Sequence, residues 1–214
     1  PQSNDFSVAG NFTNSNTFTY GTGTVTLNGT ANQQLTLSVA ASQSFYNLLI
    51  NKLTGIVNVG SNMIVRNTLT MTSGNIDNTG FTMTLGTATS ARGTLNYTSG
   101  TIIGTFERWF ATSSTGTTFL YPIGSLANYR PVNIAFANIA TAGKLAYTFT
   151  TTPPDNAGLP LTAAGITSYN NFNDGQWIAT GTSLVSTNYN LTLDGNGFTA
   201  FPFTANTRIL SEQK

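Results

Sequence analysis

Threonine hydroxyls are the most numerous groups in this sequence that could act together as an array. The 214 residues include 39 threonines and 25 asparagines. Threonine recurs at every second position in three segments, 22–26, 68–72 and 82–84, and this alternation places the hydroxyls on one face of a β-strand. A flat hydroxyl array would suit an ice-binding solenoid, but threonine is also common on any solvated strand face. The irregular spacing of the segments favours this second interpretation.

Carboxylates, which acid–base catalysis and hard cations require, are scarce in this chain. It has seven acidic residues and neither histidine nor cysteine, which excludes disulfides and the usual zinc, haem and iron–sulfur ligands. Asp5 and Asp77 are the acidic residues of the first 100 positions, far apart in sequence. Paired carboxylates of the kind that polysaccharide-active enzymes use are therefore not indicated. We predict no catalytic, cofactor-binding or metal-binding residues, and we expect that the protein is not an enzyme.

Two acidic segments of the second half have specific interpretations. Glu107 precedes Arg108, and an ion pair of Glu107 with Arg130 or another neighbour is favoured over a catalytic role. The segment 194–197, DGNG, resembles part of a calcium loop but lacks the further carboxylates that would complete one. Turns with positive φ at glycine explain this segment and the segment 173–175 better.

Aromatic side chains could form a platform for a sugar. The chain has 8 tyrosines, 2 tryptophans and 14 phenylalanines, so most of them are expected in a hydrophobic core, Trp177 among them. An exposed, coplanar pair of tyrosines or tryptophans would instead indicate carbohydrate binding. A carbohydrate-binding adhesive module, with surface glycans as partners, therefore stays open as an alternative.

Low charge limits the choice of partners. Charged residues make up 7% of the chain, and the net charge is +1. No basic patch is visible, so nucleic acid is not an expected partner. No apolar run approaches ~18 residues, so no membrane insertion is expected. The chain starts at Pro1 without a methionine or a signal peptide, and we interpret it as a mature product or a piece of a longer protein.

Short β-strands are the elements that must position these groups in the first half. In the stretch 54–86 apolar residues alternate with threonine or asparagine, and glycines punctuate the run. Similar units recur from Phe6 to about Phe106: GTVTLNGT, GIVNVGS, NTLTMTSG and GTLNYTSG. Self-similarity without a fixed repeat length indicates stacked coils. An up-and-down sandwich is the alternative, but Asn28–Gly29 is the only two-residue hairpin signal here. We therefore favour a short parallel β-helix, or β-solenoid, at residues 1–104.

Longer strands with wider spacing begin near Thr105, with prolines in or beside the turns. About 110 residues with about seven strands match a β-sandwich of immunoglobulin-like size. We therefore predict an all-β fold with two domains, a β-solenoid at residues 1–104 and a β-sandwich at residues 105–214.

Several segments resemble a known family. FSVAGNFTNSNTFTYGTGTVTLNGTANQQL and FYNLLINKLTGIVNVGSNMIVRNTLTMTSGNID are similar to the strand repeats of very large secreted surface proteins of Bacteroidota. FERWFA, TTFLYPIGSLANYRPVNIAF and GQWIAT resemble the β-sandwich module that commonly follows those repeats. The resemblance implies export by the type IX system and display as an adhesin, a filament or a surface layer. It supplies no catalytic residues.

The sequence as a whole therefore predicts a non-enzymatic structural module at the bacterial cell surface or in the extracellular space. It would serve as a filament subunit, a stalk or an adhesin segment. Its expected partners are further copies of itself or neighbouring domains of a longer chain. The end of a solenoid is an open sheet edge that can recruit another chain. The candidate inter-subunit strand contains Phe6, Val8 and Phe12.

Overall fold

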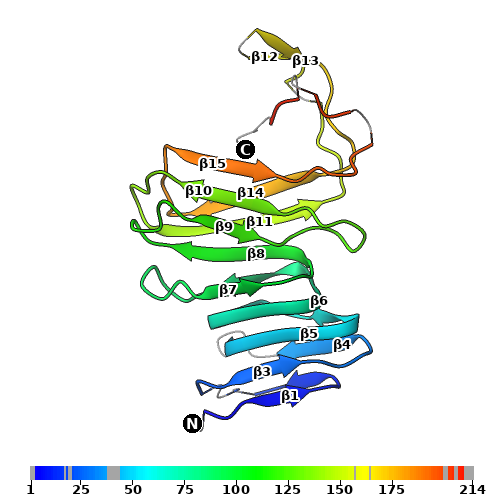
Figure 1. The fold of residues 1–214 in the computed structure, drawn as a ribbon, viewed down its shortest axis with the longest axis vertical. Helices are drawn as coiled ribbons and strands as arrows, with labels where there is room; N and C mark the ends of the chain where they lie inside the picture. Colours follow the sequence, from blue (N-terminus) through cyan, green and yellow to red (C-terminus); the bar gives the residue numbers. More distant parts are fainter. Residues whose placement is uncertain are drawn as a thin grey trace.

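The computed structural model of the protein describes residues 3–16, 18, 21–37, 44–156, 158–163, 165–199, 202–204 and 207–209. Across these ranges the chain is all-β and forms 15 strands (Figure 1). The described residues form no helix, and accordingly none that is long and apolar enough to cross a membrane.

The first half is a parallel β-solenoid of about four turns. Its strands are β1 (Phe6–Val8), β2 (Phe12–Asn14), β3 (Thr24–Leu27), β4 (Gln33–Leu37), β5 (Ser44–Val59), β6 (Met63–Leu85), β7 (Thr94–Tyr97) and the first part of β8 (Ile102–Phe110). In Figure 1 they stack along the long axis from the N-terminal end. The register between successive coils shifts by 19 residues at Phe6 and Val25 and by 26 at Leu69 and Leu95. This variation explains why no fixed repeat length is visible in the sequence.

Each coil after the first contributes three strand segments, so the solenoid has three faces. Inward side chains of successive coils stack in columns, since paired residues of parallel strands point the same way. The column of the first face is Val25, Leu48, Leu69 and Leu95. The column of the second face is Val57, Ile76 and Ile102, and the third face stacks Phe45 on Val65 and Met83 on Phe106.

The strands of the solenoid are longer than the alternation in the sequence suggests. The stretch 54–86 reads as four or five short strands, whereas β5 and β6 are continuous over 16 and 23 residues. Both strands bend around the corners between faces, and their pairing resumes after irregularities in register. Gly74 and Gly80, which look like breaks between strands, therefore lie at corners within β6, whereas Gly60 and Gly86 lie outside the strands.

Asparagine and aspartate side chains bridge successive coils near these corners. Asn75 Oδ1 accepts a hydrogen bond of 2.9 Å from the backbone N–H of Thr101, which lies 26 residues later in the chain. Four further pairs follow the same pattern: Asp5 with Thr24, Asn11 with Gln34, Asn32 with Ile56, and Asn62 with Thr82. The high asparagine content thus supplies acceptors for backbone donors that would otherwise lack a partner.

Antiparallel strands extend the stack beyond the solenoid. They are β9 (Thr118–Tyr121), β10 (Val132–Phe136), β11 (Gly143–Thr150), β12 (Leu161–Ala163), β13 (Ile166–Ser168), β14 (Gln176–Thr182) and β15 (Tyr189–Leu193). β8 pairs in parallel with β6 and antiparallel with β11, which pairs with β14. A second sheet has the order β15-β10-β9, and β12 pairs with β13.

Aromatic side chains fill the space between the two antiparallel sheets. The ring centroids of Phe110 and Phe119 lie 4.9 Å apart, and those of Tyr121 and Tyr147 lie 4.8 Å apart. One buried apolar cluster runs from Val25 in the solenoid to Phe149 in β11. The domain boundary expected from the sequence, between residues 104 and 105, falls inside β8. This strand pairs in parallel with β6 of the solenoid and antiparallel with β11.

Candidate functional site

The first coil of the solenoid ends the stack. Within the described residues β1 pairs with β3 alone and β2 pairs with β4 alone, so the other edge of each strand has no partner. Phe6 and Val8 pair with the buried residues Val25 and Leu27, which makes them inward positions. Phe6 is nevertheless 40% exposed. The first coil therefore has strand edges without a described strand partner beside a partly exposed phenylalanine of the apolar core.

The three predicted inter-subunit residues lie together in this coil. Phe6 and Phe12 have ring centroids 6.3 Å apart, and the ring centroid of Phe12 lies 6.0 Å from that of Phe45 in β5. Val8 is partly buried and packs against the same core. Chemically the coil can pair with another extended strand and cover its aromatic side chains.

A buried polar network connects the first three coils. Lys52 is 2% exposed, and its ammonium donates to the carbonyls of Gly29 at 2.5 Å and Ala31 at 2.8 Å, and to Gln33 Oε1 at 2.9 Å. The amide of Gln33 in turn donates to the carbonyls of Val8 and Gly10. Burial lowers the pKa of Lys52. All three donors of the ammonium have acceptors, so this lysine links coils and needs no carboxylate.

Glu107 forms an ion pair with a neighbouring residue, as expected, but the partner is Lys144 and not Arg130. Glu107 bonds to Lys144 at 3.0 Å and to the hydroxyl of Thr84 at 2.9 Å. Arg130 lies elsewhere, 4.7 Å above the ring of Phe198. Glu107 is in register with Thr84 and Ala146 on the outward side of β8, so Lys144 of the adjacent strand β11 is within its reach.

The neighbouring Arg108 points into the core. It is in register with the buried Leu85, and its guanidinium donates to the carbonyl of Leu120 at 2.9 Å. The guanidinium also lies 5.3 Å from the ring of Phe119. Burial lowers the pKa of Arg108. The pair of residues that looked like one charged unit is thus split between the two faces of β8.

The stacked rings of Tyr97 and Tyr129 are the candidate for an aromatic platform that could bind a sugar. Their rings lie 6.1 Å apart with an angle of 6° between planes, and Tyr129 is 37% exposed. Desolvation raises the pKa of both hydroxyls, and the hydrogen bond between them raises that of Tyr129 further. Trp177, interpreted above as a core residue, is partly buried against Phe149 at 5.3 Å.

Asp155, Asp174 and Asp194 lie outside the strands of the second half. Asp194 Oδ1 accepts a hydrogen bond of 2.8 Å from the N–H of Asn196, and φ is 139° at Gly175 and 82° at Gly197. Among the described residues, no three histidine, cysteine, aspartate or glutamate side chains come together in a way that could hold a metal ion.

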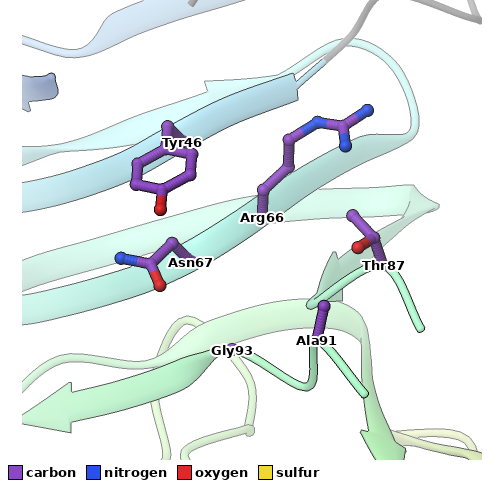
Figure 2. Close-up of a pocket in the computed structure, with 6 residues that line it drawn as sticks. All are labelled: Tyr46, Arg66, Asn67, Thr87, Ala91 and Gly93. Atoms are coloured by element: carbon purple, nitrogen blue, oxygen red, sulfur yellow. The ribbon is translucent and has the colours of Figure 1, made fainter. Parts of the chain in front are cut away.

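A groove on the solenoid surface is a second candidate site (Figure 2). It has a volume of about 240 Å³ and is lined by Tyr46, Arg66, Asn67, Thr87, Ala91 and Gly93. Figure 2 shows Tyr46 and Asn67 on one side of Arg66, and Thr87 and Ala91 on the other. The Nε of Arg66 donates to the hydroxyl of Ser44 at 3.1 Å. The lining combines a cation, an aromatic ring, an amide and a hydroxyl.

Sequence reasoning missed this groove and the Lys52 network. One signal for the groove is present in the sequence, because the spacing of inward residues changes at one corner. Leu85 and Leu95 are ten positions apart, against four for Val65 and Leu69. Nothing in the local pattern around Lys52 indicates its acceptors, since they lie 19 to 23 residues away.

The described residues form an all-β structure in which antiparallel sheets extend a β-solenoid. No family model, no curated protein and no solved structure matches the chain.

Proposed function

We propose that this protein is a non-enzymatic structural module of the bacterial cell surface or extracellular space. It serves as a filament subunit, a stalk or an adhesin segment in a protein of the type IX-secreted kind found in Bacteroidota. Its partners are other copies of the chain or neighbouring domains.

The observation that carries the proposal is the open first coil. The strands of this coil each have only one described strand partner, and its Phe6 is 40% exposed, so the coil gains hydrogen bonds and apolar burial when another chain covers it. The strand edges of β1 and β2 carry no lysine or proline, two devices that commonly prevent such pairing.

Stiffness is the second property that suits a stalk or a filament. The stacked columns bury aliphatic side chains on all three faces, and the corner amides tie each coil to the next. In such a structure each coil is stabilised mainly by its neighbours. The outward threonine and asparagine side chains are uncharged, so the surface is little affected by salt.

Sedimentation velocity over a wide concentration range tests the proposal. The wild-type protein is expected to form species larger than the monomer as concentration rises, whereas Phe6→Glu is expected to remain a monomer. Thr70→Glu is the matched control, because Thr70 lies on the outward side of β6 in the middle of the stack. A wild-type protein that stays monomeric throughout, or an equal effect of both substitutions, would sink the proposal.

Carbohydrate binding is the second candidate function, and the stacked pair of Tyr97 and Tyr129 favours it. The rings are nearly parallel, and Tyr129 is partly exposed to solvent. A glycan array probed with the wild type and Tyr129→Ala distinguishes this role, since binding through the ring would be lost in the variant.

A further inference from the structure

A short β-hairpin stands apart from the other sheets. Its strands β12 and β13 pair with each other, Leu161 opposite Ser168 and Thr162 opposite Thr167. In the part of the chain that the structure describes, neither strand pairs with any other strand. Figure 1 shows the hairpin beyond β14 and β15, at the end of the molecule opposite β1. A two-stranded hairpin by itself is at best marginally stable in water, so a third strand would stabilise this one.

The segments that lead to and from the hairpin hold it in place. Residues 151–160 connect β11 to β12, and residues 169–175 connect β13 to β14. The side-chain amide of Asn171 donates to the carbonyl of Asp155 at 2.6 Å and to Oδ1 of Asn156 at 3.2 Å. These bonds tie the two segments together, so the hairpin is held at the end of the molecule.

The two faces of the hairpin differ in polarity. Leu161, Ile166 and Ser168 share one face, because opposed residues of an antiparallel pair point the same way, as do residues two apart in a strand. Leu161 is 46% exposed. Thr162 and Thr167 lie on the other face, where their hydroxyls are hydrogen-bonded at 2.9 Å. The hairpin thus has one face with an exposed leucine and one with hydroxyls, as the strands of the solenoid do.

The first coil is suited to receive such a strand. One inward column of the solenoid ends at the exposed Phe6, and its members are Leu95, Leu69, Leu48, Val25 and Phe6. A hairpin strand placed beside β1 would add Leu161 to this column and direct a threonine outward. β1, β12 and β13 each have three residues, so their backbones can pair over their full length.

Neither surface carries a charge that would oppose the contact. The segment 156–173, which includes the hairpin, contains no charged residue, and neither does the segment 6–20, which includes the strands of the first coil. Burying uncharged groups that become hydrogen-bonded costs far less than burying charges. The two surfaces lie at opposite ends of one chain, so one copy can use both at once.

We propose that the β12–β13 hairpin of one copy adds to β1 of the next copy, with Leu161 covering Phe6. Such a contact joins two different surfaces, so it is head-to-tail and builds an open chain of copies in place of a closed dimer. The inference rests on the proposed association through the first coil, and it names the surface that covers this coil.

Sedimentation velocity of two variants and their mixture tests the proposal. Leu161→Glu and Phe6→Glu are each expected to remain monomers, since each lacks one of the two surfaces. Their equimolar mixture is expected to form dimers and nothing larger, because the intact hairpin of one variant binds the intact first coil of the other. Thr162→Glu is the matched control, since this exposed side chain lies on the hydroxyl face; it is expected to associate as the wild type does.

Cross-linking identifies the two surfaces independently. The chain contains no cysteine, so Ser7→Cys and Thr162→Cys each introduce a single thiol. A short bismaleimide is expected to join the two variants when they are mixed and to leave each variant alone largely monomeric. Thermal unfolding of Leu161→Glu is expected to match that of the wild type, because Leu161 lies outside the buried apolar cluster of the stack.

The outcomes separate this proposal from the one on which it rests. Association of Leu161→Glu to the same extent as the wild type, or a mixture that stays monomeric, would overturn the hairpin as the partner. Efficient cross-linking of Ser7→Cys with itself would do the same and would show that two first coils face each other. In these cases association through the first coil stands if Phe6→Glu still abolishes it. A wild-type protein that is monomeric at every concentration would overturn both.

Discussion

Phe6 and Val25 occupy equivalent inward positions on successive coils, yet 40% of Phe6 is exposed and 3% of Val25. The difference arises because Val25 lies beneath the coil that contains Phe6, whereas no described coil stacks on Phe6, which contacts the rings of Phe12 and Phe18 of its own coil. Fully burying a phenylalanine side chain is worth roughly 1.5–3 kcal/mol relative to full exposure. The uncovered fraction of Phe6 is therefore a driving force for association at this coil.

The lysine network should contribute strongly to stability. Lys52→Met leaves the carbonyls of Gly29 and Ala31 and one lone pair of Gln33 without their donor, so we expect a loss of roughly 2–4 kcal/mol in the free energy of unfolding. Urea denaturation measures it. Lys144→Met is the control, since this lysine is partly exposed in its pair with Glu107 and should cost at most about 1 kcal/mol. Equal losses would contradict the network's role.

The corner asparagines should be replaceable only by another acceptor. Asn75→Ala leaves the N–H of the buried Thr101 without its partner, which should cost about 1–2 kcal/mol. Asn75→Asp should retain most of the stability, because Asp5 already plays this part for Thr24. Thermal unfolding of the two variants compares them. If aspartate were as damaging as alanine, acceptor loss would not be the cause.

Substitutions at Gly80, within β6, and at Gly86, directly after it, can distinguish backbone strain from steric conflict. Gly80 and Gly86 have φ of 83° and 89°, so alanine at either should cost about 1–2 kcal/mol in strain. A Cβ at Gly80 meets no atom within 4 Å, whereas one at Gly86 lies 2.6 Å from the carbonyl oxygen of Ala91. Gly86→Ala should therefore be worse by roughly 2 kcal/mol. Chemical denaturation of both variants decides, and similar losses would show that the corner loop yields readily.

Alkaline pH should destabilise the antiparallel half. Burial raises the pKa of Tyr147 to about 12, against about 10 in the unfolded chain. Between these values the unfolded state has lost the proton that the folded state retains, so stability falls as pH rises. Tyr147→Phe should reduce this fall, and Tyr169→Phe, at a ring that is 68% exposed, should not. Urea midpoints measured from pH 9 to pH 12 would contradict the expectation if the Tyr147 variant followed the wild type.

The alternation of apolar and polar residues was sufficient to predict an all-β fold with a solenoid. A period-two pattern reflects the local geometry of a strand. It is visible in this sequence because each strand of the solenoid has one side that faces the core and one that faces outward. The first coil could be proposed as an association site from sequence because the end of a solenoid is an open sheet edge.

Contacts between distant strands could not be predicted. Glu107 pairs with Lys144, 37 residues away, because β8 joins β11, and local sequence does not specify that pairing. The same holds for Lys52, whose acceptors belong to an earlier coil. The groove at Arg66 depends on how three corners of different length stack, so its lining becomes evident only when the register is known.

Amide hydrogen exchange as a function of protein concentration tests the central claim most directly. If other chains cover the first coil, the backbone amides of β1 and β2 should exchange more slowly as concentration rises, while those of β6 in the middle of the stack should not change. Exchange of the β1 and β2 amides that is independent of concentration, up to the highest that is soluble, would contradict association through this coil.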